Sequence, residues 1–401
     1  MTIKLKIAIL FIVFTATLQA SSTKFGLACN TLGNLYIPYS TAGYGRSFEI
    51  ASTDSFHLNA RNFSMWSNIS ASTFAIGLDY NLTSSYNGKT NDIIDDWYLQ
   101  NILIAAPIVR KKVSVGIGIQ PVTQINQHVI NSVVSEEQQI DEYMFIRGGT
   151  GKAFINVAYQ IIPQIGVGLA YEYTFGNMQS DYRLEFRSPV QASLILNLDS
   201  RASGSGFALS ANATPFSGFT LGIMWRTSVN LNISRVVDSN SEKLNQESTL
   251  LMRIPDEYNV GLQYQVNNRW VVGTDGIYQD WKNSYFIDGQ KTNRMKPYYR
   301  IGIGVERKNS GKKFDKYYRK IVYRGGLFYD QKMHKSNNAY IREYGLSVGM
   351  EFPLIWNRSK FEAAMMIGRR GDISINQYEE NFLGLSFSIT IGEIWFENPE
   401  E

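Results

Sequence analysis

Cysteine, histidine and long apolar runs are scarce in this chain of 401 residues. Cys29 is the only cysteine, which excludes an intramolecular disulfide. The three histidines, at positions 57, 128 and 334, have no serine or aspartate partner at a recognisable spacing, so no catalytic triad is expected. Beyond residue 22 there is no run of about 18 apolar residues, and no transmembrane helix is predicted there.

A Pro-rich or Ser-rich linker is also missing, and no shift in composition divides the chain into domains. The formal net charge of +4 is small for this length, and we expect no nucleic-acid partner. The chain is instead rich in glycine and aromatic residues, with 33 Gly, 24 Tyr, 22 Phe and 7 Trp. This composition is typical of transmembrane β-barrels, whose aromatic residues ring both membrane interfaces.

The N-terminus has the pattern of a secretory signal peptide. Lys4 and Lys6 precede an apolar stretch from residue 7 to residue 14, and small residues follow between Ala16 and Ser22. A basic, an apolar and a small-residue segment in this order direct export and are then cleaved off. We therefore expect an exported protein that loses residues 1–22.

Short segments with a period of two recur through the rest of the chain. In "VGLQYQVNNRWVVGTDGIYQDW", residues 260–281, apolar and polar residues alternate up to an Asn-Asn turn, after which an aromatic-rich strand returns. This is the pattern of a β-hairpin. Fourteen strands are predicted, at 70–82, 97–109, 113–122, 151–161, 165–175, 203–214, 219–233, 257–266, 270–282, 297–307, 320–330, 340–352, 360–371 and 381–396. The segments 83–96, 123–150, 176–202, 234–256 and 283–296 are expected to be long outer loops.

The two faces of these strands distinguish a membrane barrel from a soluble sandwich. In "VSVGIGIQ", residues 113–120, valine and isoleucine form one face, while Ser, Gly and Gln form the other. A sandwich would bury its large residues and expose charged ones. Here the second face consists mainly of small residues, with a few charged ones. The sequence therefore predicts an all-β fold, a transmembrane antiparallel β-barrel of about 14 strands.

Several segments resemble one family of such barrels. "RIPDEYNVGLQYQVNNRWVVGTDGIYQDW", "YRGGLFYD", "EYGLSVGMEFPL" and "GRRGDISINQYEENFLGLSFSITIGEIWF" resemble hairpins of the outer-membrane long-chain fatty acid transporter family, the FadL/TodX-like proteins. "GYGRSFEIASTDSFHLNARNFSMW" resembles the N-terminal plug of that family. The family's plug carries Asn-Pro-Ala, whereas the nearest match here is Asn62-Phe63-Ser64, which leaves the gating role of this plug open.

The resemblance implies a multi-pass barrel in the outer membrane of a Gram-negative-type bacterium. A plug at 23–69 would fill the lumen of a barrel at 70–396, and residues 397–401 would be a periplasmic tail. The implied function is passive uptake of hydrophobic compounds such as long-chain fatty acids or aromatic hydrocarbons. The implied partners are a hydrophobic small-molecule ligand, membrane lipid, lipopolysaccharide and, during insertion, the barrel-assembly machinery.

Seven residues are candidates for substrate contacts, and each has a structural alternative. The aromatic candidates in the plug, which can line a pocket or simply pack the plug against the wall, are Phe48, Phe56, Phe63 and Trp66. Arg226, Arg300 and Arg324 are predicted to face the lumen, where a guanidinium can bind a carboxylated substrate. Alternatively, these arginines pair with lumen acids, which include Glu172, Glu343 and Glu351.

No enzyme activity, metal or cofactor is predicted. "GTGK" at 149–152 lacks the first glycine and the Ser or Thr of a phosphate loop, and it leads into a strand. The acidic "NDIIDDW" at 91–97 is typical of a solvated loop. One alternative to transport stays open: a barrel of the same fold that acts as a non-transporting scaffold or secretion accessory and binds a protein through its outer loops.

Overall fold

The computed structural model describes residues 33–37, 39–54, 56–135, 138–186, 193–240, 246–284, 286–287, 290–291, 295–309, 314–336, 338–354 and 359–393. The expected signal peptide, Cys29, the first ten residues of the expected plug and the tail at 397–401 lie outside these ranges. Within them, no helix is long and apolar enough to cross a membrane.

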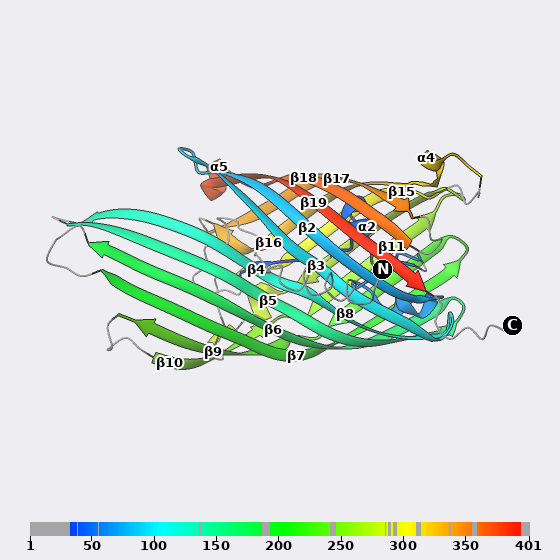
Figure 1. Ribbon diagram of the computed structural model, residues 1–401, viewed down its shortest axis with the longest axis horizontal. Coiled ribbons are helices and arrows are strands. Elements are labelled where there is room, and N and C mark those ends of the chain that lie inside the picture. The colour runs from blue at the N-terminus through cyan, green and yellow to red at the C-terminus, as the bar shows by residue number, and fades with distance from the viewer. Residues whose placement is uncertain are drawn as a thin grey trace, which may run out of the picture.

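The chain forms one closed antiparallel barrel of fourteen strands, as predicted (Figure 1). The last strand pairs with the first, from Glu379 opposite Tyr86 to Glu393 opposite Ser72, which closes the wall. In chain order, with β8 and β9 and likewise β10 and β11 forming one strand each, the wall consists of β2 (Ser72–Tyr86), β3 (Asn91–Val109), β4 (Val113–Ser135), β5 (Gln138–Ile162), β6 (Ile165–Phe186), β7 (Leu194–Phe216), β8 (Phe219–Arg226), β9 (Val229–Ser239), β10 (Gln246–Ile254), β11 (Glu257–Gln265), β12 (Trp270–Gln279), β15 (Tyr298–Arg307), β16 (Val322–Ser336), β17 (Ala339–Pro353), β18 (Ser359–Asp372) and β19 (Tyr378–Glu393).

Short elements occupy the connections and the N-terminal segment. Inside the barrel lie β1 (Asn34–Leu35), α2 (Thr41–Arg46) and the 3-10 helix η2 (Phe63–Asn68). The connections carry α3 (Trp281–Ser284), β13 (Phe286–Ile287), β14 (Gln290–Lys291), α4 (Tyr317–Lys320) and α5 (Ile373–Asn376).

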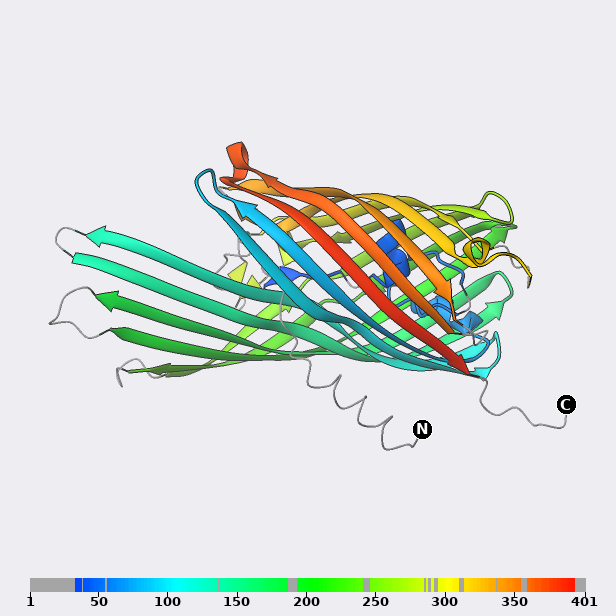
Figure 2. The ribbon, with the colours of Figure 1, turned by 45° about the horizontal axis from the view of Figure 1, so that its top comes forward.

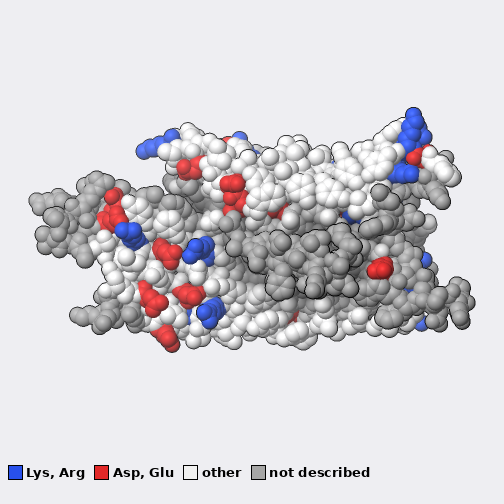
Figure 3. Space-filling view, in the orientation of Figure 1, with Lys and Arg blue, Asp and Glu red and all other residues white. Residues whose placement is uncertain are grey.

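Near the short turns, the wall has an apolar outside and a small or polar inside. On β6 the outward residues run from Ile165 to Phe175 at every second position, and the inward ones include Gly168 and Glu172. Eleven residues, 165–175, match the roughly 9–11 that a tilted strand needs to cross a bilayer. On the face seen in Figure 3, most charged atoms of the described residues lie toward the two ends. This wall therefore suits a lipid environment.

A substitution on the outer face of β4 tests this orientation. Ile117 is 51% exposed on the outside of the barrel. Ile117→Arg should lower the free energy of unfolding by about 2–4 kcal/mol, because it would place a charge near the middle of the bilayer. Denaturant titrations in detergent or lipid would measure this, with Ile117→Leu as the control. Gly118 is unsuitable as a control, since a Cβ there would lie 2.6 Å from both Leu103 and Phe154.

The wall continues beyond the membrane on the side away from the short turns. β4, β5, β6 and β7 are 22 to 25 residues long. The expectation of long loops at 83–96, 123–150, 176–202 and 234–256 is therefore wrong, because strands occupy most of each segment. The acidic "NDIIDDW" at 91–97, expected in a loop, belongs to β3. The extended strands stand out at the left of Figure 1.

In this extension the polarity of the two faces is reversed. On β6 the outward positions become Asn177, Gln179, Asp181 and Arg183, while Met178 and Tyr182 pack inward. Once a strand leaves the lipid, its outside meets water and its inside collects the apolar residues. We call the resulting inner surface the outer cup; it comprises Ile125, Met144, Ile146, Met178, Tyr182, Ile233 and Met252.

β3 and β4 separate partway along the wall. Their pairing ends at Ile102 opposite Ile119, after which β3 pairs only with β2, while β4 continues along β5 to Ser135. The two strands diverge visibly in Figure 2. In this fork β1 pairs with β4, with Asn34 opposite Gln124 and Leu35 opposite Thr123.

The described part of the N-terminal segment lies inside the barrel and touches the wall on many sides. The backbone N–H groups of Glu49 and Ile50 donate to Asp275 on β12, at 2.5 and 3.0 Å. Ser64 N donates to Ser210 Oγ on β7 at 2.9 Å, and Ser114 on β4 donates to Trp66 O at 2.7 Å. Residues 39–54 and 56–69 therefore pack against the inner face of the wall at the level of the membrane span.

Glycine on the wall permits this close approach. A Cβ at Gly302 or Gly304 would collide with the backbone carbonyl oxygens of Ser47 and Arg46, respectively. Only a residue without a side chain lets two backbones meet at this distance. The glycine-rich inner face of the strands is therefore shaped to hold a folded segment.

Candidate functional site

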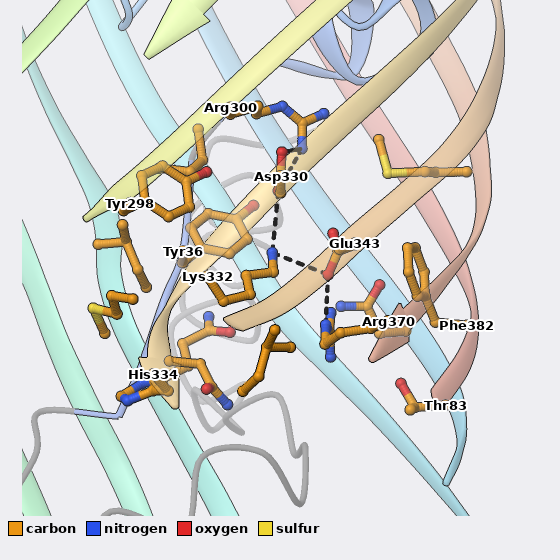
Figure 4. A pocket seen from close by; sticks show the side chains of 18 of the residues that line it. Tyr36, Thr83, Tyr298, Arg300, Asp330, Lys332, His334, Glu343, Arg370 and Phe382 are labelled. Atoms are coloured by element: carbon orange, nitrogen blue, oxygen red, sulfur yellow. Dashed lines mark hydrogen bonds and ion pairs between the residues drawn. The ribbon is translucent and has the colours of Figure 1, made fainter. Parts of the chain in front are cut away.

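A cavity of about 140 Å³ lies between the N-terminal segment and the upper lumen wall (Figure 4). Its floor is formed by residues 34–37 together with Tyr39 and Tyr44. The rest of the lining comes from one continuous part of the wall, β15 to β19 followed by β2, β3 and β4, because β19 pairs with β2. The cavity adjoins the fork, because its lining includes both Leu35 and Gln124.

One wall of the cavity is a row of alternating charges, which we call the ion ladder. Asp330 binds Arg300 at 3.0 Å and Lys332 at 3.1 Å, and Glu343 binds Lys332 at 3.0 Å and Arg370 at 2.5 Å. Glu380, 2.8 Å from Arg370, ends the row. Figure 4 shows the first four contacts as one continuous line. Three cations face three acids, so the ion ladder as a whole carries no net charge.

The floor and the remaining lining are largely aromatic and apolar. They include Leu35, Tyr36, Ile37, Tyr44, Tyr98 and Phe382. The Tyr36 hydroxyl donates to Asp79 Oδ2 at 2.5 Å, and its ring lies edge-on to Tyr98 at 5.2 Å. Burial, and then the nearby Asp79 carboxylate, raise the pKa of Tyr36 well above its ordinary value, so the phenol stays protonated. The cavity is therefore amphipathic, lined by both charged and aromatic side chains.

Tyr36 also spans the fork. Its backbone N–H donates to Val122 O on β4 at 2.9 Å, while its side chain reaches Asp79 on β2. Farther out, Asn126 on β4 donates to Asp96 on β3 at 3.0 Å. These two bridges hold the separated strands in place where backbone pairing has ended.

The three predicted arginines do face the lumen, but they lie apart and each is ion-paired. Arg300 belongs to the ion ladder. Arg226 lies 2.9 Å from Glu172 and 2.5 Å from Glu257, beside a cavity of about 50 Å³. Arg324 lies in a polar cavity of about 260 Å³ near the short turns. Arg226 pairs with Glu172 and Arg324 pairs with Glu351, which agrees with the alternative that these arginines bind lumen acids instead of a substrate.

Arg324 is the centre of a second charge cluster. It contacts Glu306 at 2.8 Å, Glu351 at 2.5 Å and Glu362 at 2.9 Å, and its side chain is 3% exposed. The N-terminal segment joins this cluster from inside: Arg46 binds Glu306 at 2.5 Å, and Asp54 binds Lys360 at 2.9 Å. The cluster thus ties the segment to four strands of the wall, β15 to β18.

The four predicted plug aromatics lie in the N-terminal segment, away from the three cavities described here. Phe63 and Trp66 pack on Phe154 of β5, with ring centroids 4.9 and 6.1 Å away. Phe48 is fully buried beneath Gly273, where a Cβ would collide with its ring. Phe56 is half-buried. These contacts fasten the segment to the wall; whether any of the four meets a substrate stays a prediction.

A buried acid and a histidine join two turns of the N-terminal segment. Glu49 Oε1 lies 2.7 Å from His57 Nε2, and the Ser40 backbone N–H donates to Glu49 Oε2 at 2.9 Å. Burial alone would raise the pKa of Glu49, but the hydrogen bond and charge of His57 and the donors of Ser40 outweigh it, and the pKa lies below its ordinary value. The ionised carboxylate is therefore the form that holds the turns together.

This arrangement predicts a pH-dependent effect of Glu49→Gln. Because the folded pKa is lower than the unfolded value of about 4.3, the stabilisation by Glu49 is complete above that pH and is lost as the pH falls through the folded pKa. Unfolding midpoints should therefore differ most between wild type and Glu49→Gln near pH 6, and the two should converge toward pH 3. A difference that stays constant over this range would contradict the role of the ionised carboxylate.

Several lining residues were missed at the level of sequence. Tyr36, Lys332 and Arg370 lie in no recognisable motif. His334, expected in an outer loop, is instead a buried residue of β16, with Nε2 3.2 Å from Gly33 O. The side chain of His128 lies outside the described residues. In the described ranges, no three His, Cys, Asp or Glu side chains converge as metal ligands.

Solved structures with the same fold confirm the resemblance to FadL/TodX-like barrels. A Pseudomonas aeruginosa FadL homologue is 12% identical, covering 89% of this chain and 98% of its own, with a TM-score of 0.59. The Ralstonia pickettii toluene transporter TbuX is also 12% identical, with 91% and 100% covered and a TM-score of 0.59. The P. putida toluene transporter TodX is 13% identical, with 89% and 99% covered and a TM-score of 0.57.

Among curated proteins, none matches this sequence. The identities to the solved barrels are too low to carry more than the fold. A family model, in contrast, matches residues 45–400, which is most of the expected mature chain and includes the barrel and the part of the N-terminal segment from residue 45 onward. The chain therefore belongs to the BamG family.

Proposed function

We propose that this protein is an outer-membrane channel for passive uptake of small hydrophobic molecules. The observation that carries the proposal is the amphipathic cavity beneath the outer cup. An apolar molecule arriving from outside would first meet the inward-facing Met144, Ile146 and Met178. It would then pass to the aromatic wall around Tyr36. Both steps remove apolar surface from water, which favours binding without an energy source.

The volume of the cavity favours a single ring over a long chain. At about 140 Å³ it is close to an engineered cavity of about 150 Å³ that binds benzene. Pockets for drug-sized ligands have volumes of about 300–1,000 Å³. We therefore propose a substrate of the size of an aromatic hydrocarbon rather than a long-chain fatty acid.

The charges of the cavity favour a neutral substrate. In the ion ladder Arg300, Lys332 and Arg370 are each within 3.1 Å of an acid. A carboxylated ligand would have to displace one of these acids and leave it buried without its partner, which is costly. A neutral molecule with one hydrogen-bonding group can contact the ladder without breaking it.

The fork supplies a side exit in this proposal. Tyr36 separates the cavity from the place where β3 and β4 part, and a single hydrogen bond to Asp79 holds its hydroxyl. Rotation of this ring would connect the cavity with the lipid next to Ile102 and Ile119. A hydrophobic molecule would then leave into the membrane without crossing the polar cluster around Arg324.

Filling the cavity tests the proposal. Thr83 is buried on the lumen side of β2 and lines the cavity, whereas its neighbour Leu82 lies on the other face of the strand. Thr83→Trp should reduce uptake of a labelled monoaromatic compound to the level of cells that lack the protein. Leu82→Trp, the matched control, should preserve uptake, since interfacial aromatics are tolerated on the outer face. If both variants and the deletion strain take up a panel of hydrophobic compounds at the wild-type rate, transport is refuted.

A scaffold is the second candidate function, and the dense ion pairing of the lumen favours it. The N-terminal segment is bound to the wall through buried ion pairs of Arg46 and Arg61 and through Asp54, a more exposed residue that pairs with the buried Lys360. The long outer strands would then present a surface to a partner protein. In that case the variants at Thr83 and Leu82 would leave uptake unchanged, and the protein would be isolated in a stoichiometric complex.

A further inference from the structure

The connection between β15 and β16 carries an unusual concentration of exposed aromatic side chains. Phe314 is 95% exposed, Tyr317 56% and Tyr318 51%, and none of the residues of α4 is buried. A single exposed apolar residue is ordinary, but three within five positions form a patch that calls for a binding partner. We refer to residues 314–320 as the α4 segment.

The same segment is basic. Lys316, Arg319 and Lys320 outnumber the single acid Asp315, which lies 3.8 Å from Arg319. Arg319 also lies over the Tyr318 ring, 5.8 Å from its centroid. In Figure 3 blue atoms gather at the upper right, where Figure 1 places α4. Aromatic rings interleaved with cations are suited to the surface of a lipid bilayer, where negatively charged headgroups cover an apolar layer of acyl chains.

The position of the α4 segment is at the end of the lipid-facing wall. Tyr317 donates to Pro353 O at 3.4 Å, at the last residue of β17, and Tyr323 of β16 donates to Tyr318 O at 3.1 Å. Next to it, the outer faces of β17, β18 and β19 carry stacked rings, Phe352 on Phe361 at 6.1 Å and Phe361 on Phe387 at 6.4 Å. Such a belt marks the level of the lipid headgroups, and the segment continues it outward.

We propose that the α4 segment binds anionic phospholipid headgroups of the periplasmic leaflet. Short turns mark the periplasmic end of a barrel, and α4 lies on that end. Lys316 and Lys320 would contact the phosphates, and Phe314 would enter the interface between headgroups and acyl chains. The segment would thereby anchor one edge of the barrel, whether or not the barrel transports a substrate.

Lipid titrations followed by native mass spectrometry test this proposal. Purified protein in detergent should bind phosphatidylglycerol more tightly than phosphatidylethanolamine. Lys316→Gln combined with Lys320→Gln should weaken phosphatidylglycerol binding about thirtyfold, since each of the two cations near a lipid surface contributes about 1 kcal/mol and about 1.4 kcal/mol is a factor of ten. The matched control is Lys111→Gln combined with Lys112→Gln, in the exposed turn after β3, where no aromatic cluster accompanies the cations. This control should weaken binding less than the α4 variant does, because no aromatic cluster holds these two cations at the headgroup level.

Two outcomes would overturn the proposal. An equal loss in the control variant would show that any basic turn on this rim attracts anionic lipid. A lack of preference for phosphatidylglycerol would show that the charges do not select the lipid. A photo-crosslinking phenylalanine analogue at the exposed position 314 gives a second reading in cells: lipid adducts support the proposal, and a periplasmic protein as the main adduct refutes it.

Discussion

Arg324→Met should lower the free energy of unfolding by about 3–5 kcal/mol, the usual effect of removing one partner from a buried ion pair. Arg324 is 3% exposed and holds Glu306, Glu351 and Glu362 at 2.5 to 2.9 Å. Without it, only Arg46 and Lys360 would face these three carboxylates. The midpoint of denaturant unfolding in detergent, followed by tryptophan fluorescence, would measure the loss.

Three further variants separate the role of this cluster from a general effect of charge. Arg319→Met removes an exposed cation whose ion pair with Asp315 is 3.8 Å long, and it should cost less than about 1 kcal/mol. Arg324→Lys keeps the charge but cannot reach three acids with one ammonium group, so an intermediate loss is expected. Adding Glu351→Gln to Arg324→Met should recover part of the stability. If Arg324→Met were as mild as Arg319→Met, the cluster would not hold the wall and the N-terminal segment together.

The number of strands could be predicted from sequence because lipid requires apolar residues at every second position in the membrane-spanning part of each strand. Runs such as 113–120 and 165–175 alternate without exception, since one face meets acyl chains and the other meets small residues. Beyond the membrane the polar residues face outward and the apolar residues face inward. Asn177 and Arg183 turn outward while Met178 and Tyr182 turn inward, so a search for strands of one polarity and about ten residues ends too early.

The site was less accessible from sequence, because its geometry depends on residues far apart in the chain. The arginines could be assigned to the lumen from strand periodicity, but their partners come from other strands, as with Arg226 and Glu257. The path of the N-terminal segment has no periodicity at all. It is fixed by individual contacts such as Asp275 with the backbone of Glu49, and by wall glycines that admit it. No sequence pattern marks Tyr36, because its position matters only through the fork between β3 and β4.

Deleting residues 25–66 should convert a nearly silent protein into one with a large ion conductance. At the level of the membrane span, residues 39–54 and 56–69 lie in the lumen. They pack on β4 to β7 through Phe63 and Trp66 and on β15 to β18 through the Arg324 cluster. Barrels of 16–18 strands without such a filling leave an aqueous channel, and fourteen strands are nearly as wide. Planar bilayers with purified wild-type and deleted protein would measure the change.

Uptake should change in the opposite direction in the same deletion variant, if the proposed route is right. The floor of the cavity, including Tyr36, Tyr39 and Tyr44, would be lost with the deleted residues. The deletion variant would then have an open, ion-conducting lumen but no binding site for a hydrophobic substrate. Cells with the deletion should thus admit small ions and polar solutes while their uptake of monoaromatic compounds falls. A scaffold would gain the conductance with no uptake to lose. If the intact protein already conducts like a porin, the N-terminal segment does not block the lumen in the membrane. Both the transport route and the scaffold function would then be contradicted.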